Sequence, residues 1–400
     1  MAQPDRSGGG DIPGGGRYFA LVTAPASAVT RFLGACRGEV VAWSYFLKML
    51  WDFGRIAYVR TRMNLRSFIT GFAGVSGHEA LTAYRCNTCE EVVERTCGKG
   101  NYTALLGKVA IITGASNGLG LENARCMMKY GCHVVWAVRS PDKAAAALQR
   151  LEEREGKLQG KATILKVELS DLRTIKPFVK DFLALGLPLH YLICNAGIMA
   201  PTEWLPSPQG FELMFATNNL SHFLMTELLM PKMKETGKTS EVRIVVLSSV
   251  AGACCLNINP EKLPCPKEEY HEFAEYGVTK ALDCLHAQHL QRHHGSDNIV
   301  ACAVHPGIIG TGLGQGNIGL TSLLYGGMFT AIFRKSVAKG AATTLHCALS
   351  PEVSAQVKSG ASFFYNCAPQ APPNIMAPGK NKGLDDRLYE RQLELVRPYM

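Results

Sequence analysis

The feature that most restricts the fold of this chain is a glycine-rich turn between a strand and a helix. The run KVAIIT, residues 108–113, is short and apolar, as expected for a buried strand. It leads directly into GASNGLG, residues 114–120, and then into a helical stretch. Gly114 permits a sharp turn, while Gly118 and Gly120 let the backbone approach a dinucleotide whose pyrophosphate lies over the positive helix end. The stretch therefore predicts a dinucleotide-binding turn.

The same alternation of strand and helix continues along the chain. Apolar runs recur and are separated by helical stretches such as PDKAAAALQRLEERE. Strands that alternate with helices at this pace form parallel βαβ units, and ligands then bind at the carboxyl ends of the strands. We predict an α/β fold with a single doubly wound parallel sheet of roughly seven strands. The expected strands cover residues 108–113, 133–138, 162–169, 189–194, 243–248, 299–304 and 361–366.

Composition agrees with a large globular domain that carries extensions. The chain has 400 residues, of which 47% are hydrophobic and 19% charged, so it can bury a full core. The net charge of +9 comes from scattered residues and not from a basic run, so no nucleic-acid partner is expected. The fourteen cysteines have no regular spacing and are interpreted as reduced thiols, which favours an intracellular, reducing compartment.

The first hundred residues carry weaker signals. SGGGDIPGGG is flexible and of low complexity, and no basic region followed by an uninterrupted apolar stretch comes after it. Residues 39–59 are apolar and aromatic but contain Lys48, Asp52 and Arg55, which is too much charge for a membrane span. An amphipathic helix that lies on a membrane or packs on the main domain fits better. The Arg-rich, acid-poor composition leaves an organelle transit peptide open, so the predicted location is cytoplasmic, organellar or membrane-associated.

A CxxC pattern ends this segment. Cys86, Cys89 and Cys97 could contribute to a zinc site, but a structural site usually needs four ligands and no fourth is evident nearby. We interpret these residues as unpaired thiols and expect no metal.

Six short motifs, taken in order, resemble those of the short-chain dehydrogenases/reductases. They are TGASNGLG (113–120), NAG (195–197), TNN (217–219), SS (248–249), YGVTK (276–280) and HPG (305–307). The resemblance covers about residues 105–370 and implies a Rossmann-type domain there, after an extension over 1–104 and before a tail and helix over 371–400. GFELMFATNNLSHFLMTELLMP and SGASFFYNC are similar to retinol dehydrogenases and to the dehydrogenase part of WW-domain oxidoreductases, although no WW module is visible upstream.

The resemblance assigns a proton-transfer site to Tyr276, Lys280, Ser249 and Asn218. Tyr276 and Lys280 are four residues apart, so on a helix they share one face. A phenol is a poor acid or base near neutral pH, and we expect Lys280 and an oxidised nicotinamide to lower its pKa. Ser249 would hydrogen-bond the substrate oxygen, and Asn218 would hold a water that connects Lys280 to solvent.

Two neighbouring residues offer alternatives to this assignment, and a third is excluded. Ser248 could replace Ser249, and Asn219 could replace Asn218. Tyr270 is excluded as the catalytic tyrosine because Ala274, and not a lysine, follows it four residues later.

The residue after the second predicted strand indicates which of the two dinucleotides, NAD or NADP, is preferred. An acidic residue there would bind the ribose 2′-hydroxyl of NAD, but this chain has Arg139, whose guanidinium suits a 2′-phosphate. NADP is therefore favoured over NAD, and Glu168 stands where the family often has the Asp that holds the adenine amine. The full set of predicted cofactor contacts is Gly114, Ser116, Asn117, Gly118, Leu119, Gly120, Arg139, Glu168, Leu169, Asn195, Ala196, Gly197, Tyr276, Lys280, Pro306, Gly307 and Thr311.

The substrate is predicted only by class. The apolar, glycine-rich segment 312–335 lies where relatives carry their substrate loop, and it suits a hydrophobic alcohol or carbonyl such as a retinoid, a steroid or a lipid aldehyde. The same motifs also resemble light-dependent protochlorophyllide reductases, which reduce a ring double bond. A cofactor-sensing or scaffold protein on this fold is the alternative from another class. Peripheral membrane contact and a homo-oligomer stay open.

Overall fold

The computed structural model describes residues 88–199, 201, 203–255, 258–307, 309, 335–370 and 383–400. The expectations for residues 39–59, Cys86, Thr311 and most of the apolar segment 312–335 lie outside these residues. Everything below concerns the described part of the chain.

An eight-stranded sheet forms the centre of the described fold, with strand order β3-β2-β1-β4-β5-β6-β7-β8. All neighbouring strands pair in parallel except β7 and β8. The predicted doubly wound sheet of about seven strands is confirmed, with a two-residue antiparallel strand added at its edge. The strands are β1 Val109–Thr113, β2 His133–Val138, β3 Ala162–Lys166, β4 Tyr191–Cys194, β5 Val242–Leu247, β6 Ile299–His305, β7 Phe363–Tyr365 and β8 Ala368–Pro369.

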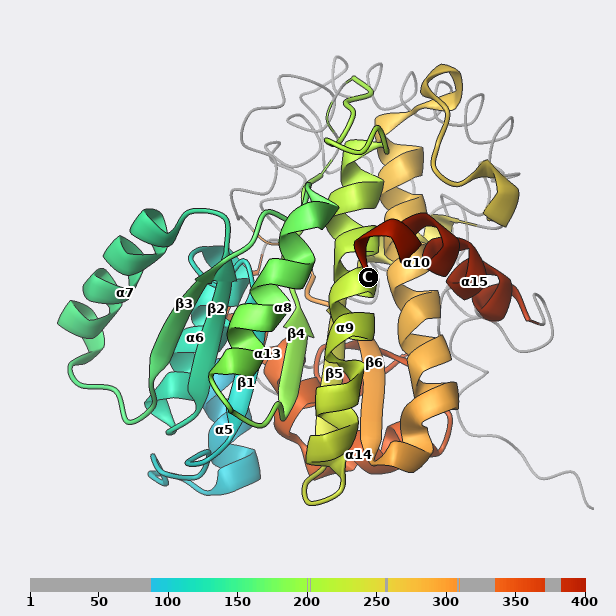
Figure 1. The fold of residues 1–400 in the computed structure, drawn as a ribbon. Coiled ribbons are helices and arrows are strands. Elements are labelled where there is room, and N and C mark those ends of the chain that lie inside the picture. Colours follow the sequence, from blue (N-terminus) through green and yellow to red (C-terminus); the bar gives the residue numbers. More distant parts are fainter. Residues whose placement is uncertain are drawn as a thin grey trace, which may run out of the picture. The chain divides into compact units, whose positions relative to one another are not determined.

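Helices cover both faces of this sheet. Figure 1 shows α8, α9 and α10 in front of the strands and α6 and α13 behind them. Because β1 pairs with β2 on one side and with β4 on the other, the chain reverses direction across the sheet beside β1. The helices are α5 Cys89–Cys97, α6 Gly118–Lys129, α7 Pro141–Glu155, α8 Ile175–Ala184, α9 Ser221–Gly237, α10 Glu272–His294, α13 Val337–Leu349, α14 Pro351–Lys358 and α15 Leu384–Val396.

The strands are apolar on both faces, as a sheet between two helix layers requires. In β1, Val109 and Ile111 join the core under α8, α9 and α10, while Ala110 and Ile112 join the core on the opposite side. Since side chains alternate along a strand, an unbroken apolar run serves both cores. This is why the strands could be predicted as apolar runs without polar alternation.

Helix α5 belongs to the segment predicted as an extension, yet it is attached to the sheet domain. Cys89, Val92 and Val93 are buried in the same core as residues of α6 and α13. Glu90 also accepts a hydrogen bond from Arg125 of α6 at 2.9 Å. The chain is therefore packed against the domain from Cys89 onward.

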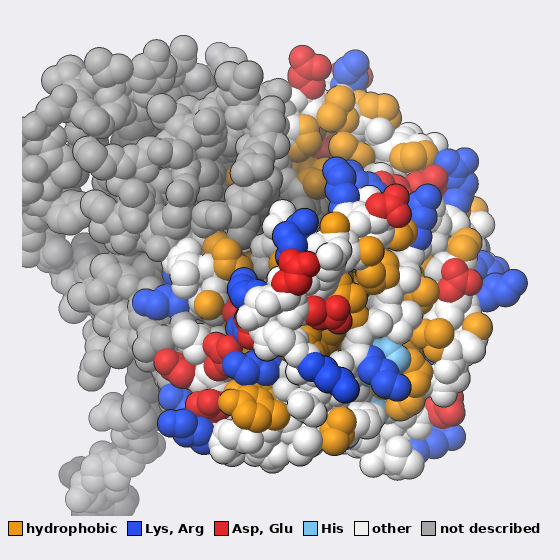
Figure 2. All heavy atoms as spheres, turned by 90° about the vertical axis from the view of Figure 1, so that its left-hand side faces the viewer, with side chains coloured by type: hydrophobic (Ala, Val, Ile, Leu, Met, Phe, Trp, Pro, Cys, Tyr) orange, Lys and Arg blue, Asp and Glu red, His pale blue; other side chains and the backbone are white. Residues whose placement is uncertain are grey.

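The surface near α7 and β3 is of mixed charge. Figure 2 shows Lys and Arg side chains interspersed with Asp and Glu across this side of the molecule. Within the described residues, no helix is both long and apolar enough to cross a membrane. The eleven cysteines whose side chains the structure describes are free thiols, and ten of them are buried.

Candidate active site

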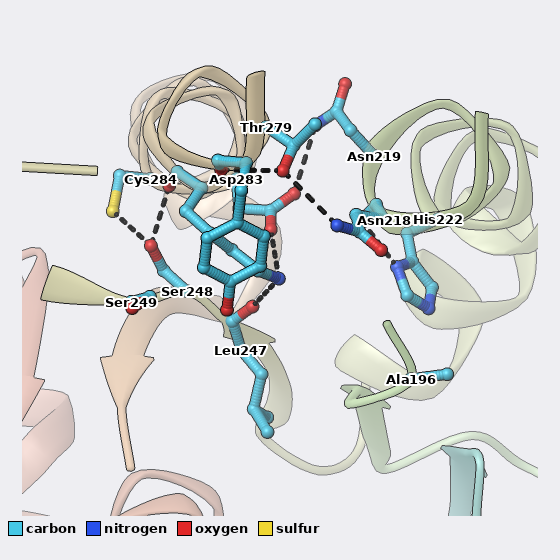
Figure 3. Close-up of polar contacts among 12 residues, drawn as sticks. Ala196, Asn218, Asn219, His222, Leu247, Ser248, Ser249, Thr279, Asp283 and Cys284 are labelled. Atoms are coloured by element: carbon cyan, nitrogen blue, oxygen red, sulfur yellow. Dashed lines mark hydrogen bonds and ion pairs between the residues drawn. The ribbon is translucent and has the colours of Figure 1, made fainter. Parts of the chain in front are cut away.

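Helix α10 brings Tyr276 and Lys280 to the carboxyl end of β5. The Lys280 ammonium donates to the Leu247 carbonyl oxygen at 2.8 Å and to Oδ2 of Asp283 at 2.9 Å. Its Nζ atom lies 5.9 Å from the centre of the Tyr276 ring. Figure 3 shows Leu247 and Asp283, the two partners of this ammonium. The predicted i, i+4 pair is therefore buried at the carboxyl end of β5.

The two adjacent serines have different surroundings. The Ser248 hydroxyl donates to the Lys280 carbonyl oxygen at 2.6 Å and accepts from the Cys284 thiol at 3.1 Å. The Ser249 hydroxyl instead lies near enough to the Tyr276 phenol to lower its pKa. It also caps the short helix η3, Val250–Cys254, by accepting from the Ala251 amide at 3.2 Å. The structure thus brings Ser249, and not Ser248, to the phenol.

Asn218 lies in a π-helical turn, η2 Phe215–Leu220, immediately before α9. Its side chain accepts from the Ile198 amide at 2.8 Å and donates to the Ile198 carbonyl at 2.9 Å. A Cβ built at Gly197 would lie 3.2 Å from Oδ1 of Asn218 and 3.8 Å from Nζ of Lys280. Gly197, Asn218 and Lys280 therefore converge, and the described contacts of Asn218 hold the backbone after β4. The role as a water holder stays a prediction.

The Tyr276 phenol has a raised pKa in this structure. Its pKa is about 12: burial has the largest effect and raises it, the nearby Ser249 hydroxyl lowers it, and the Asp283 carboxylate raises it. The sequence led us to expect a pKa lowered by Lys280 and by a bound cofactor. The direction differs because burial disfavours the phenolate and because Asp283 is paired with the Lys280 charge. Without a cofactor, Tyr276 is therefore protonated at neutral pH.

The glycine-rich turn leaves a backbone cradle between β1 and α6. Gly114 and Gly118 have φ angles of +68° and +55°, which favour glycine. A Cβ at Gly120 would clash with the Gly114 carbonyl and lie 2.6 Å from Nδ2 of Asn195. The Asn117 side chain caps α6 by accepting from the Gly118 amide at 2.8 Å. This geometry fits the pyrophosphate of a dinucleotide at the α6 N-terminus.

Thr113 connects this cradle to the proton-transfer residues. Its hydroxyl oxygen accepts from the amides of Asn195 and Ala196, each at 2.9 Å, and lies 2.9 Å from Nε2 of His222. Nδ1 of His222 lies 3.0 Å from the Asn218 carbonyl oxygen, to which it can only donate. Burial lowers the pKa of His222 to about 4, so the ring is neutral near neutral pH and its Nε2 can accept from the Thr113 hydroxyl.

The edge of the sheet beyond the cradle carries Arg139 and Glu168. Arg139 follows β2, and Glu168 follows β3, its parallel neighbour. The Arg139 side chain is 80% exposed and its Nε lies 3.8 Å from the Glu168 carboxylate, which also accepts from the Ser170 hydroxyl at 2.8 Å. A cation and a carboxylate thus stand side by side where the adenosine end of a dinucleotide would lie.

The other predicted cofactor contacts lie along the same edge. Ser116 and Leu119 are in the turn and the first turn of α6, Leu169 is buried after β3, and Pro306 and Gly307 follow β6. Gly307 has a φ of +96°, so it also needs glycine. The roles of these residues in binding stay predictions.

Sequence reasoning missed two polar residues behind Lys280, namely Asp283 and Gln392, and considered Asn219 only as an alternative to Asn218. Asp283 accepts from Lys280 and from Nδ2 of Asn219 at 3.1 Å, and Asn219 accepts from the Gln392 side chain of α15. The three-residue spacing of Lys280 and Asp283 on one helix is a signal that could have revealed their pairing. No local signal connects Gln392 with a residue 173 positions away.

A second polar cluster joins α10 to α15. His289 and His293 lie 3.0 and 3.1 Å from Oδ1 of Asp386, and these three ligand atoms are within 4.8 Å of one another. The Arg292 guanidinium also binds this oxygen and contacts Asp385 at 2.7 Å. Because the arginine occupies the carboxylate that a metal would need, we interpret the group as an ion-pair cluster between two helices.

The fold and the site together define a class of protein, the doubly wound α/β oxidoreductases. The profile of the short chain dehydrogenase family matches residues 108–261. Among relatives, the short-chain dehydrogenase TIC 32 B, chloroplastic, of Brassica napus is 33% identical over 340 residues, covering 84% of this chain and 99% of that protein. The chain belongs to the short-chain dehydrogenase/reductase family.

Two further comparisons agree with this assignment. Retinol dehydrogenase 12 of Mus musculus is 34% identical over 290 residues, covering 72% of this chain and 86% of that protein, which confirms the resemblance to retinol dehydrogenases. The solved structure of L-sorbose reductase from Gluconobacter frateurii, complexed with NADPH and L-sorbose, superposes with a TM-score of 0.50 at 20% identity. It covers 68% of this chain and 98% of its own, and it supports the fold.

Proposed function

We propose that this protein is an NADP(H)-dependent oxidoreductase that interconverts a hydrophobic alcohol and its carbonyl compound. The observation that carries the proposal is the placement of the Ser249 and Tyr276 hydroxyls near the buried ammonium of Lys280. A proton donor, a second hydroxyl and a cation gathered in one buried region suit the reduction of a carbonyl group.

The proposed mechanism assigns one task to each residue. A nicotinamide dinucleotide held at the glycine-rich turn would supply the hydride for the carbonyl carbon. Ser249 donates a hydrogen bond to the carbonyl oxygen and fixes its position. Tyr276 gives its proton to that oxygen as the C=O double bond becomes a C–O single bond, so the product is the alcohol. Lys280 stabilises the phenolate that Tyr276 becomes, and the reverse steps oxidise an alcohol.

The residues around the cradle fit a dinucleotide. Gly114 and Gly118 adopt the positive φ angles of the turn, and Gly120 lets α6 pack closely on it, so the turn leads into the α6 N-terminus, where a pyrophosphate would bind. The exposed Arg139 supports NADP, because a guanidinium binds a phosphate through two parallel hydrogen bonds. Glu168 would then accept from the adenine amine.

The surroundings of Tyr276 support a hydrophobic substrate. Met199, Met214 and Tyr276 form a small buried cluster of their own, against which Ile198, Ala251 and Tyr270 pack. Thioether and aromatic side chains make an adaptable apolar surface. A retinoid, a steroid or a lipid aldehyde would suit such a lining.

We also propose that the protein works in a reducing compartment inside the cell. The free thiols of the described part support this, since chains of this size in oxidising compartments usually form disulfides.

The function is tested with a panel of hydrophobic aldehydes and ketones, assayed with NADPH and with NADH at the absorbance of the reduced nicotinamide. We expect turnover of apolar carbonyls, faster with NADPH, and loss of turnover in Tyr276→Phe. Nucleotide binding without turnover across the panel would overturn the proposal and favour a cofactor-sensing role. Reduction of a conjugated double bond with the carbonyl intact would favour the double-bond reductases.

A further inference from the structure

We propose that Asp283 is a positioning residue, which holds the Lys280 ammonium and offsets its charge, and that Asn219 and Gln392 connect this carboxylate to helix α15. The inference rests on the proposed function, because it concerns the acidity of Tyr276. Its parts come from three elements that are far apart in sequence: η2, α10 and α15.

The pair of Lys280 and Asp283 is buried. The Lys280 side chain is 7% exposed and that of Asp283 is 2% exposed, with 2.9 Å between Nζ and Oδ2. A buried charge is costly unless a partner compensates it. Burial raises the pKa of Asp283, and the nearby ammonium opposes that rise. The Asp283 carboxylate therefore depends on Lys280 to stay charged.

Two contacts fix the position of the ammonium. Lys280 donates to the Leu247 carbonyl at the end of β5 and to Asp283 on its own helix. An ammonium has three N–H donors, so one donor is left for a ligand. The carboxylate thus sets the direction in which Lys280 can offer its last hydrogen.

Asp283 is itself held from the other side. Its second oxygen, Oδ1, accepts from Nδ2 of Asn219 at 3.1 Å, and Oδ1 of Asn219 accepts from Nε2 of Gln392. All three side chains belong to buried residues. The C-terminal helix therefore reaches the catalytic lysine through an unbroken chain of hydrogen bonds, partly visible in Figure 3.

The charge of Asp283 acts on Tyr276, because it raises the pKa of the phenol. Three other titratable groups face the pair, namely Cys194 on β4, Cys284 on α10 and His222 on α9. Burial raises the pKa of both thiols to about 12 and lowers that of His222 to about 4, so all three are uncharged near neutral pH. The balance between Lys280 and Asp283 therefore controls the charge near the phenol.

The decisive variant is Asp283→Asn, which removes the charge and keeps the size. We measure kcat/KM for carbonyl reduction against pH, where the alkaline limb reports loss of the Tyr276 proton. An unopposed Lys280 should move this limb to lower pH by roughly one unit or more. Glu227→Gln is the matched control: it neutralises a carboxylate on α9 that accepts from Tyr389 of α15, and it should leave the limb in place. A limb that does not move in Asp283→Asn, or that moves equally in both variants, overturns the proposal.

Two further measurements keep the test decisive. If Asp283→Asn does not fold by circular dichroism, Gln392→Ala takes its place and should shift the limb less but in the same direction; an unchanged limb overturns the proposal. If the wild type turns over no substrate, the proposed function fails on its own. Tyrosinate absorbance against pH, with the Tyr276→Phe spectrum subtracted, then reads the phenol directly. Ionisation at lower pH in Asp283→Asn supports the inference, and coincident curves overturn it.

Discussion

Two cations flank the candidate site, and their surroundings differ sharply. Arg139, at the edge after β2, has a side chain that is 80% exposed and lies 3.8 Å from its carboxylate partner. Lys280, on α10, has a side chain that is 7% exposed and lies 2.9 Å from Asp283. Solvent screens the exposed charge strongly, whereas it screens the buried charge much less. The exposed cation can therefore tune which ligand is preferred, while the buried cation can govern chemistry.

Tyr276→Phe should produce the largest effect on the buried side of this comparison. The variant removes one hydroxyl and keeps the ring, so nucleotide binding survives while kcat falls by roughly 10²–10⁴-fold. Steady-state assays on a verified substrate measure this. The matched control is Tyr130→Phe, because the buried Tyr130 hydroxyl has no hydrogen-bond partner among the described residues. Near-normal kcat in Tyr276→Phe would show that the phenol is not the proton donor.

Alanine variants of the two serines should show which hydroxyl acts in catalysis and which one only supports the structure. Ser249→Ala removes the hydroxyl beside Tyr276 and should lower kcat by roughly 10²-fold, together with the small loss of stability expected from removing the η3 cap. Ser248→Ala removes the contacts with Lys280 and Cys284, and should lower the free energy of unfolding by about 1 kcal/mol. The opposite pattern in paired kinetic and thermal measurements would reverse the assignment.

Buried histidines such as His222 should make the free energy of unfolding fall in mild acid. The pKa of His222 is 6.5 when unfolded and about 4 when folded, so its contribution is complete above 6.5 and is lost as pH falls toward 4. The full loss is about 3 kcal/mol. Urea unfolding measured between these values should show a steep fall in stability. His222→Gln should flatten that slope by up to one proton, and an unchanged slope would contradict the assignment of a neutral, buried ring.

The variant Arg139→Asp tests whether the exposed cation determines the choice between NADP and NAD. The carboxylate should repel a 2′-phosphate, so the ratio of kcat/KM for NADPH to that for NADH should drop by roughly tenfold or more. Arg150→Asp, an equal charge change at an exposed position of α7, should leave the ratio unchanged. Equal ratios in all three proteins would remove the basis for NADP preference.

Deletion of residues 1–75 should have the smallest effect. Helix α5, which packs on α6 and α13, begins only at Cys89. The shortened chain should therefore fold and bind NADP with an affinity close to that of the full chain, as titration of the nucleotide against protein fluorescence would measure. Loss of binding would place part of the deleted segment in the structural core.

The fold could be predicted because its signals are local. Apolar runs such as that of β1 serve two cores and are recognisable in sequence, and Gly114, Gly118 and Gly120 mark the turn by themselves. The motif spacing also led to Tyr276 and Lys280. By contrast, Ser248 and Ser249 are adjacent and chemically identical, so only the packing of α10 distinguishes them. The connection from Asp283 to Gln392 depends on how distant helices meet, which no local pattern encodes.

The π-helical turn η2 determines which way the side chains that follow it face around the helix axis. Two neighbouring side chains of this turn bind different parts of the molecule. The Asn218 side chain binds the backbone after β4, and the Asn219 side chain binds Asp283. One inserted or deleted residue rotates everything beyond it by about 100° around a helix axis. The π-helical turn sets the rotation of α9 about its axis relative to the site. Insertions and deletions should therefore be far less tolerated here than substitutions are.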